Sequence, residues 1–509
     1  MRTIALCTLV FAVACGGAGA GKAPPNAAAG GEPAAIAPTG TASSSAASFR
    51  DKAPEPGKLA APVFPKADAR KLPNGIQLII YEMHDVPVVR MTMVGFSSRS
   101  AVSTVRWRLA ERATAKHSVE ALASAWQSLG AEHGALIGDD AAGLSVKVMA
   151  KDFETASTLL LEEWMEPTRD EKELSRLKLE LVEGVKSERS DLASVARNLV
   201  RVPLERYMRS ESGTEESLAS VSLSAVLEDA KCLKLDVVSQ PKLTSTACPT
   251  VAFVAGDIRA DDVSKRLSRL SCPKLQGGTG GGYGSERHGG GWRMGARKGA
   301  TQAHVYLASY GVPFSTDEDR AAFWVMNEIL GGSFSSRINM NLREKNAFTY
   351  GAYSRYRPFS SHGLWSVGGP MKADKAGEAF AEIRVEIERI RTQAVGDEEL
   401  RRAKDSWLRT LPARYETADD VVGAWLQDWV LLDRSDEQNT FDSHSSRFSK
   451  QIEAVTKEQV MESAKKYLAP ARLDLVTVGD PDLIAAEFAP FKLGTPVAYD
   501  ELGMPLKAK

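Results

Sequence analysis

The chain repeats part of itself, and this repeat constrains the fold more than any other feature. The segment "KELSRLK", which ends at Lys178, resembles "EELRRAK", which ends at Lys404, 226 residues later (404 − 178). The segments "VAGD" and "TVGD" end at Asp257 and Asp480, 223 residues apart (480 − 257). Two independent matches at nearly one offset indicate an internal duplication, because copied structural units recur at a fixed period.

Each copy has the pattern of an α+β unit. "KLPNGIQLII" places an Asn-Gly turn signal before alternating apolar residues, as a strand does, and "DEKELSRLKLELVEGVKSER" has helical spacing of its apolar residues. "TQAHVYLASYGVP" and "GDEELRRAKDSWLRTLPARYE" repeat this order. We therefore predict an α+β fold with two homologous units, residues 66–275 and 293–495, each an antiparallel-rich sheet covered by helices, arranged as a clamshell. The glycine-rich segment 276–292 between them is predicted to be a linker.

The residues before the first unit predict export. Residues 1–15 contain one arginine, a short apolar run and then Cys15, which is typical of a bacterial signal peptide and too short to span a bilayer. "AVAC" resembles the lipobox of lipoproteins, so lipidation of Cys15 is expected, with secretion without lipid as the alternative. Residues 16–65, rich in Ala, Gly, Pro and Ser, predict a flexible tether. We expect an exported protein of the cell envelope or periplasm, held to a membrane by a lipid alone.

Composition disfavours several other classes. The chain has 64 Lys and Arg against 65 Asp and Glu, so its charge does not indicate a nucleic-acid partner. Cys232, Cys248 and Cys272 allow one disulfide without deciding which pair forms it, and no Cys-x-x-Cys spacing indicates a zinc site. No two of the seven histidines stand three to five residues apart, and no Gly-x-Ser-x-Gly or phosphate-binding loop is present.

The second unit contains the most specific motif. Residues 330–354, "LGGSFSSRINMNLREKNAFTYGAYS", closely resemble a segment of the second paired domain of the insulinase/pitrilysin family of metallopeptidases, to which mitochondrial processing peptidase is related. "KLPNGIQLII" resembles the opening strand of that family, and the resemblance runs from about Lys71 to Phe488. It implies duplicated domains that cut peptides held as an added strand on a sheet edge. It also implies zinc bound by the two histidines of an inverted His-x-x-Glu-His motif and by a later Glu, with the Glu between the histidines as the base that takes a proton from the metal-bound water.

The resemblance assigns functional roles to two residues of the second unit. Arg343 and Tyr350, seven residues apart, occupy the family positions of an Arg at the end of a helix and a Tyr at the start of a strand. A guanidinium can donate to a peptide carbonyl, and a phenol can donate to an oxyanion. Both are therefore expected to act on a substrate from across an active site.

The first unit departs from the family at the zinc motif. In "RWRLAER", Arg108 and Arg112 occupy the two His positions around Glu111, at spacings that place all three on one helix face as a salt-bridged group. A guanidinium has no lone pair for a cation, so neither arginine can bind zinc. The later ligand position falls on Gly184, and His117 is the one histidine close to the lost motif. No metal is expected in this chain.

These observations predict a non-catalytic subunit of a zinc endopeptidase, inactive alone. Its expected partners are a zinc-bearing subunit of the same family, which would supply the metal, and a peptide substrate. One alternative is a degenerate peptidase that serves as a peptide-binding or scaffold lipoprotein of the envelope. A further alternative is an active zinc peptidase with unorthodox ligands.

Overall fold

The computed structural model of the chain describes residues 57, 64–96, 100–138, 141–168, 170–201, 213–231, 251–269, 290–314, 317–359, 362–431 and 441–506. The predicted signal peptide, the lipidation site Cys15, nearly all of the tether, the three later cysteines and most of the glycine-rich segment lie outside these residues. Within them, no helix combines the length and the apolar character that crossing a membrane requires.

The described residues form two six-stranded sheets. The first has the order β1-β2-β6-β3-β5-β4 and the second the order β12-β7-β11-β8-β10-β9. The strands of the first sheet are β1 Asp68–Lys71, β2 Gln77–Glu82, β3 Val88–Phe96, β4 Glu132–Ile137, β5 Ala141–Met149 and β6 Val251–Gly256. Those of the second are β7 Trp292–Ala296, β8 Gln302–Gly311, β9 Tyr353–Pro358, β10 Gly363–Lys372, β11 Asp474–Gly479 and β12 Val497–Tyr499.

Most neighbouring strands in both sheets are antiparallel. The pairs β2–β6, β7–β11 and β7–β12 are the parallel ones among the described strands. Five strands follow the same order in both sheets, β2-β6-β3-β5-β4 and β7-β11-β8-β10-β9, and this order and the covering helices confirm the predicted α+β fold with two homologous units.

The helices follow the same duplication. The first half contains α1 Ala101–Ala110, α2 Val119–Ser128, α3 Phe153–Met165, α4 Glu171–Ser190, α5 Leu192–Arg201, α6 Glu215–Ala219, α7 Leu223–Lys231 and α8 Ala260–Ser268. The second contains α9 Asp317–Asn327, α10 Arg337–Asn339, α11 Ala376–Thr392, α12 Asp397–Thr410, α13 Ala418–Leu431, α14 Phe441–Ala454, α15 Lys457–Tyr467 and α16 Pro481–Phe488. Two π-helical turns, η2 Glu328–Gly332 and η3 Met340–Lys345, follow α9 and α10. Short 3₁₀ turns are η1 Ala150–Asp152, η4 Ala373–Lys375, η5 Pro412–Tyr415, η6 Pro470–Arg472 and η7 Ala489–Phe491.

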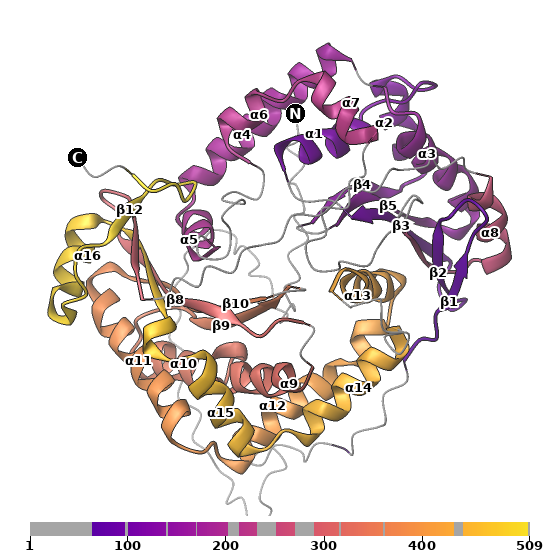
Figure 1. The fold of residues 1–509 in the computed structure, drawn as a ribbon. Coiled ribbons are helices and arrows are strands. Elements are labelled where there is room, and N and C mark those ends of the chain that lie inside the picture. Colours follow the sequence, from indigo (N-terminus) through magenta and orange to yellow (C-terminus); the bar gives the residue numbers. More distant parts are fainter. Residues whose placement is uncertain are drawn as a thin grey trace, which may run out of the picture. The chain divides into compact units, whose positions relative to one another are not determined.

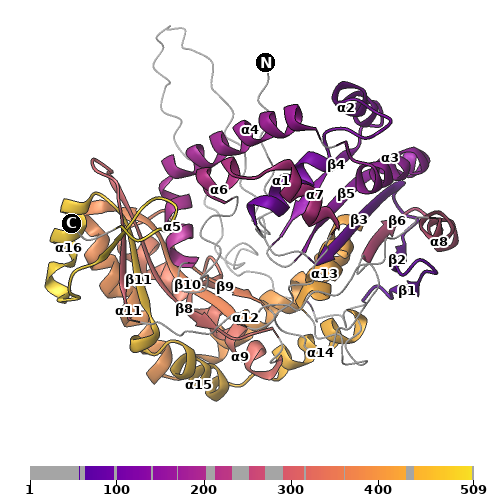
Figure 2. The same ribbon diagram turned by 45° about the horizontal axis from the view of Figure 1, so that its top comes forward.

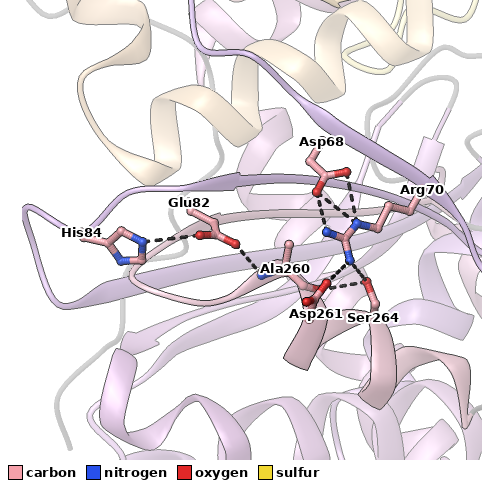
Figure 3. A network of polar contacts seen from close by, with 7 residues as sticks. All are labelled: Asp68, Arg70, Glu82, His84, Ala260, Asp261 and Ser264. Atoms are coloured by element: carbon pink, nitrogen blue, oxygen red, sulfur yellow. Dashed lines mark hydrogen bonds and ion pairs between the residues drawn. The ribbon is translucent and has the colours of Figure 1, made fainter.

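The first strands are tied to the start of α8 by polar side chains (Figure 3). Arg70 on β1 donates through Nη1 to Asp261 at 2.7 Å and to Ser264 at 3.0 Å, both on α8. Glu82, the last residue of β2, accepts a hydrogen bond from the backbone N–H of Ala260 at 2.7 Å. Because the first amides of a helix have no partner within the helix, this carboxylate stabilises the start of α8 directly after the Gly-Asp turn.

Helix α5 of the first half packs on the second sheet. Its residues Val195 and Leu199 share an apolar cluster with Ala308 of β8 and Val476 of β11. In Figure 1, α5 lies on the face of this sheet opposite to α9 and α11. A Cβ atom added at Gly295 of β7 would lie 3.1 Å from the side chains of both Val195 and Leu199. Glycine at this position therefore allows α5 to approach the sheet closely.

Helix α13 of the second half makes the reciprocal contact. It begins 226 residues after α5 (418 − 192), so it is the equivalent helix of the second copy. Val421 and Trp425 of α13 are buried against Ile79 of β2 and Phe253 of β6 in the first sheet. The opposite face of that sheet is covered by helices that include α1 and α3 (Figure 2). Each half thus supplies one helix to the core of the other.

Candidate functional site

The degenerate zinc motif lies where α1 ends. The helix stops at Ala110, Glu111 is its C-terminal cap residue, and Arg112 follows it. The prediction that Arg108, Glu111 and Arg112 all lie within one helix was therefore wrong for the last two residues. Arg108 Nη1 lies 3.1 Å from Glu111 Oε1, as the spacing suggested, whereas Arg112 forms its ion pair with Glu180 of α4. The turn after Ala110 directs Arg112 away from Glu111.

Both carboxylate oxygens of Glu111 have partners. Oε1 accepts from Arg108, and Oε2 accepts a hydrogen bond of 2.6 Å from the backbone N–H of Ala135 in β4. The side chain is 18% exposed. The glutamate that serves as the base in the family is therefore held here between a guanidinium and a strand amide.

The residues at this position do not fit a zinc ion. Two of the family's donor positions carry guanidinium groups, which stay protonated and offer no lone pair. A Cβ atom at Gly184 would meet nothing within 4 Å, and the carboxylate one helical turn earlier, Glu180, is engaged by Arg112. His117 lies apart from the motif, with Nδ1 3.0 Å from Glu162 Oε2. In the described ranges, no group of three or more His, Cys, Asp or Glu side chains is placed to hold a metal ion.

The second set of predicted site residues lies in the segment between α10 and β9, which has both buried and exposed residues. Arg343 belongs to the π-helical turn η3, and Tyr350 stands three residues before β9 begins (353 − 350). Both were expected at regular element ends, but π-helical turns are rare and frequently mark functional sites. Tyr350 is 93% exposed, and the side chain of Arg343 is 38% exposed.

Arg343 is oriented by an aromatic ring. Its Cζ atom lies 4.7 Å from the ring centroid of Phe334, and its Nε atom lies 3.3 Å from Glu344 Oε1. A guanidinium stacked on a ring keeps its in-plane N–H groups available for hydrogen bonds. Across the described residues, no hydrogen bond or ion pair joins Arg343 or Tyr350 to Arg108, Glu111 or Arg112.

The glycine-rich turn before Arg343 has a packing role. A Cβ atom added at Gly331 would lie 2.5 Å from the backbone nitrogen of Ser354 in β9. Any larger residue would therefore push η2 away from the strand that follows Tyr350. This contact explains why position 331 is occupied by glycine.

An ion pair between the buried Arg337 and the partly exposed Glu399 fixes the other end of the same segment. Arg337 donates from Nε and Nη2 to the two carboxylate oxygens of Glu399 on α12, each at 2.8 Å. These hydrogen bonds lower the pKa of Glu399 from 4.5 to about 2. The pair therefore stabilises the folded chain fully above about pH 4.5, and this contribution is lost as the pH falls towards 2.

Replacement of Glu399 with glutamine should reduce the free energy of unfolding by about 2 kcal/mol at pH 7, because a charge-assisted bidentate contact to a buried guanidinium is lost. Urea unfolding at pH 7 and pH 3 measures the effect, and the difference between wild type and variant should shrink at pH 3. Glu398→Gln is the matched control, since its pair with Arg401 is exposed and should contribute little. Equal midpoints for the two variants at pH 7 would contradict the assigned role.

The backbone between Arg343 and Tyr350 is strained at one residue. Ala347 has a φ of 53°, in the left-handed region that a Cβ atom disfavours. Ala347→Gly should therefore stabilise the chain by about 0.5 kcal/mol, measured as a higher urea midpoint. The same substitution at Ala485, exposed within α16, should instead cost about 1 kcal/mol. Destabilisation by both substitutions would show that Ala347 is not strained.

Sequence reasoning missed two contacts at the degenerate motif. Glu180 precedes Gly184 by four residues, so both lie on one face of α4, and this spacing could have identified the partner of Arg112. The bond from Ala135 to Glu111 has no such signal, because it depends on how α1 packs beside β4.

Comparison with known proteins relates the chain to zinc peptidases and their homologues. Residues 250–406 match the family described as "Peptidase M16 inactive domain". An uncharacterized zinc protease of Streptomyces coelicolor is 34% identical over 102 residues, which are 20% of this chain and 22% of that protein. An uncharacterized zinc protease of Rickettsia felis is 22% identical over 355 residues, which are 66% of this chain and 80% of that protein.

A solved structure shares the fold. The peptidase M16 inactive domain from Pseudomonas fluorescens is 19% identical and superposes with a TM-score of 0.68, covering 81% of this chain and 98% of its own. The matched family spans β6 to α12 and includes the whole segment with Arg343 and Tyr350. These matches show a peptidase M16 inactive domain over residues 250–406, and the relatives and the solved structure are similar to the chain over more of its length, in agreement with the insulinase/pitrilysin resemblance of its motifs.

Proposed function

We propose that this chain is a non-catalytic subunit of a zinc endopeptidase, in which Arg343 and Tyr350 contact a peptide at the active site of a zinc-bearing partner. The observation that carries the proposal is the contrast between the two site segments. The first has lost its zinc donors to Arg108 and Arg112, whereas the second presents a guanidinium and a phenol to solvent.

The two exposed side chains have the chemistry that peptide hydrolysis requires. Among the described residues, no hydrogen bond engages the terminal nitrogens of Arg343 or the phenol of Tyr350. Arg343 would donate to a backbone carbonyl of the peptide and thereby orient it. Tyr350 would donate to the oxygen that becomes negatively charged in the tetrahedral intermediate. The partner's zinc would supply the activated water.

The segment is held firmly enough for such a role. Arg337 and Glu399 anchor its start, and the ring of Phe334 orients Arg343. Groups that stabilise a transition state need this preorganisation, because an orienting step at the moment of reaction would cost free energy. We place the subunit in the cell envelope, anchored through a lipid on Cys15.

The test is co-expression with a chain that carries His-x-x-Glu-His and purification of the complex. Turnover of a fluorogenic peptide and zinc content should be measured for the complex and for each chain alone. We expect turnover in the complex, about tenfold or more above the partner alone, and zinc bound to the partner only. Equal turnover by the partner alone would favour the scaffold alternative. Stoichiometric zinc on this chain, lost together with activity on chelation, would favour unorthodox ligands.

A further inference from the structure

The edge of β4 that faces away from the sheet is contacted by Glu111 of the same chain. β4 is the last strand of the first sheet, and Ala135 stands opposite Leu144 of β5. In an antiparallel ladder, residues whose backbone groups face the neighbouring strand alternate with residues whose groups face away. Ala135 donates to Glu111, which lies outside the sheet, so its N–H faces away from β5. Outward groups of this kind are those with which an added strand pairs.

Glu111 Oε2 lies where the carbonyl oxygen of an added strand would accept this hydrogen bond. The nitrogen and oxygen are 2.6 Å apart, which is short even for a charge-assisted bond. A Cβ atom at Gly134 would be 3.5 Å from the same oxygen, so the carboxylate lies directly against the strand. A peptide carbonyl is neutral and makes the weaker bond, so a peptide strand has to displace a stronger acceptor.

Both partners of this hydrogen bond are held in place. Arg108 binds the other oxygen of Glu111 at 3.1 Å. On the strand, the ring of His133 stacks on Trp126 with centroids 4.2 Å apart, and its Nε2 lies 3.2 Å from Oε1 of the fully buried Glu163. The contact between Glu111 and Ala135 therefore joins the capped end of α1 to an anchored strand.

We propose that Glu111 closes the β4 edge to extended peptides. The residue that aligns with the family's base acts here as an internal substitute for a strand carbonyl, and the first unit accepts a peptide strand only when Glu111 leaves Ala135. The ligand class is any extended peptide, recognised through its backbone. The inference deepens the proposed function, because it assigns strand pairing of the substrate to the partner's sheet and leaves Arg343 and Tyr350 as this chain's contribution.

The test uses the full chain without a partner and a fluorescein-labelled peptide of alternating Thr and Val. Affinity is measured by anisotropy, and hydrogen exchange is measured at the Ala135 amide. Glu111→Ala should bind the peptide about tenfold more tightly than wild type and should exchange the Ala135 amide about tenfold faster, with protection restored by the peptide. Glu111→Gln should fall between wild type and Glu111→Ala, because its amide oxygen still accepts from Ala135 but lacks the charge that strengthens the bond.

Two controls separate strand pairing from charge. Glu180→Ala removes a neighbouring carboxylate without touching β4 and should leave both affinity and exchange unchanged. A peptide N-methylated at every residue has no backbone N–H on either edge, so it cannot pair with a strand and should bind neither form. Unchanged affinity in Glu111→Ala, or equal binding of the methylated peptide, would overturn the proposal. If that variant does not fold, the wild-type chain decides the question, since fast exchange at Ala135 would contradict closure.

The two experiments distinguish a failure of this inference from a failure of the proposed function. Failure here, with an active complex in which Arg343 matters, would refute the closure of β4 alone. A tenfold gain here, with no activity in any complex, would refute the subunit role alone.

Discussion

Replacement of Trp425 with alanine should cost about 4 kcal/mol of the free energy of unfolding, and the first sheet should lose protection most. Trp425 belongs to α13 in the second half of the sequence, yet it is 2% exposed because it packs on the first sheet. Its ring meets Tyr81 of β2 edge to face, with centroids 6.2 Å apart. Truncation would leave a cavity between α13 and this sheet, and the lost contacts belong to β2, β3 and β6.

The matched control is Trp365→Ala, in β10. That side chain is also buried, but its cluster and its hydrogen bond to Asn327 lie within the second half. Urea unfolding gives the total cost for each variant, and hydrogen exchange followed by mass spectrometry locates it. Trp425→Ala should accelerate exchange in β3 and β6, and Trp365→Ala should accelerate exchange in β8 and β10. The same exchange pattern for both variants would show that α13 does not stabilise the first sheet.

Arg343→Ala and Tyr350→Phe should each lower peptide turnover by the complex at least about tenfold, which corresponds to about 1.4 kcal/mol of transition-state stabilisation. The arginine orients the peptide, so its loss should raise KM as well as lower kcat. The tyrosine donates to charge that exists only in the intermediate, so its loss should lower kcat with little change in KM.

Two nearby residues of the same types serve as controls. Arg355 is exposed on β9, and Tyr353 is the first residue of that strand. Arg355→Ala and Tyr353→Phe should leave turnover close to wild type, since neither residue lies in the segment from Phe334 to Tyr350. If all four variants reduced turnover equally with the complex intact, the effect would belong to the surface as a whole and not to Arg343 and Tyr350.

The sequence predicted the parts of the fold that depend on local pattern. The 226-residue offset between Lys178 and Lys404 recurs in the starts of α4 and α12, and both Gly-Asp turns close a buried strand. The crossing of α5 and α13 could not be predicted in this way. Helical periodicity shows that a helix has an apolar face, but the sheet that covers this face is decided by packing between distant segments.

The site residues that belong to a continuous motif could be predicted from the sequence. The contacts that depend on where a helix ends could not. Arg343 and Tyr350 followed from the resemblance of one continuous segment. The end of α1 at Ala110 did not follow, because charges spaced three and four residues apart fit both a continuing helix and a capped one. Because α1 ends before Arg112, this arginine pairs with Glu180 and not with Glu111.

Because α5 packs on the second sheet and α13 packs on the first, each half completes the apolar core of the other. Produced alone, residues 66–275 would leave the β2 and β6 face uncovered, and residues 293–495 would present the apolar stripe of α13 to water. Separate halves should be insoluble singly and should assemble when refolded together, since the missing surfaces are complementary. The glycine-rich segment joins the two halves covalently and therefore raises the local concentration of one half for the other. The two copies should then unfold as one cooperative unit, although their site residues differ.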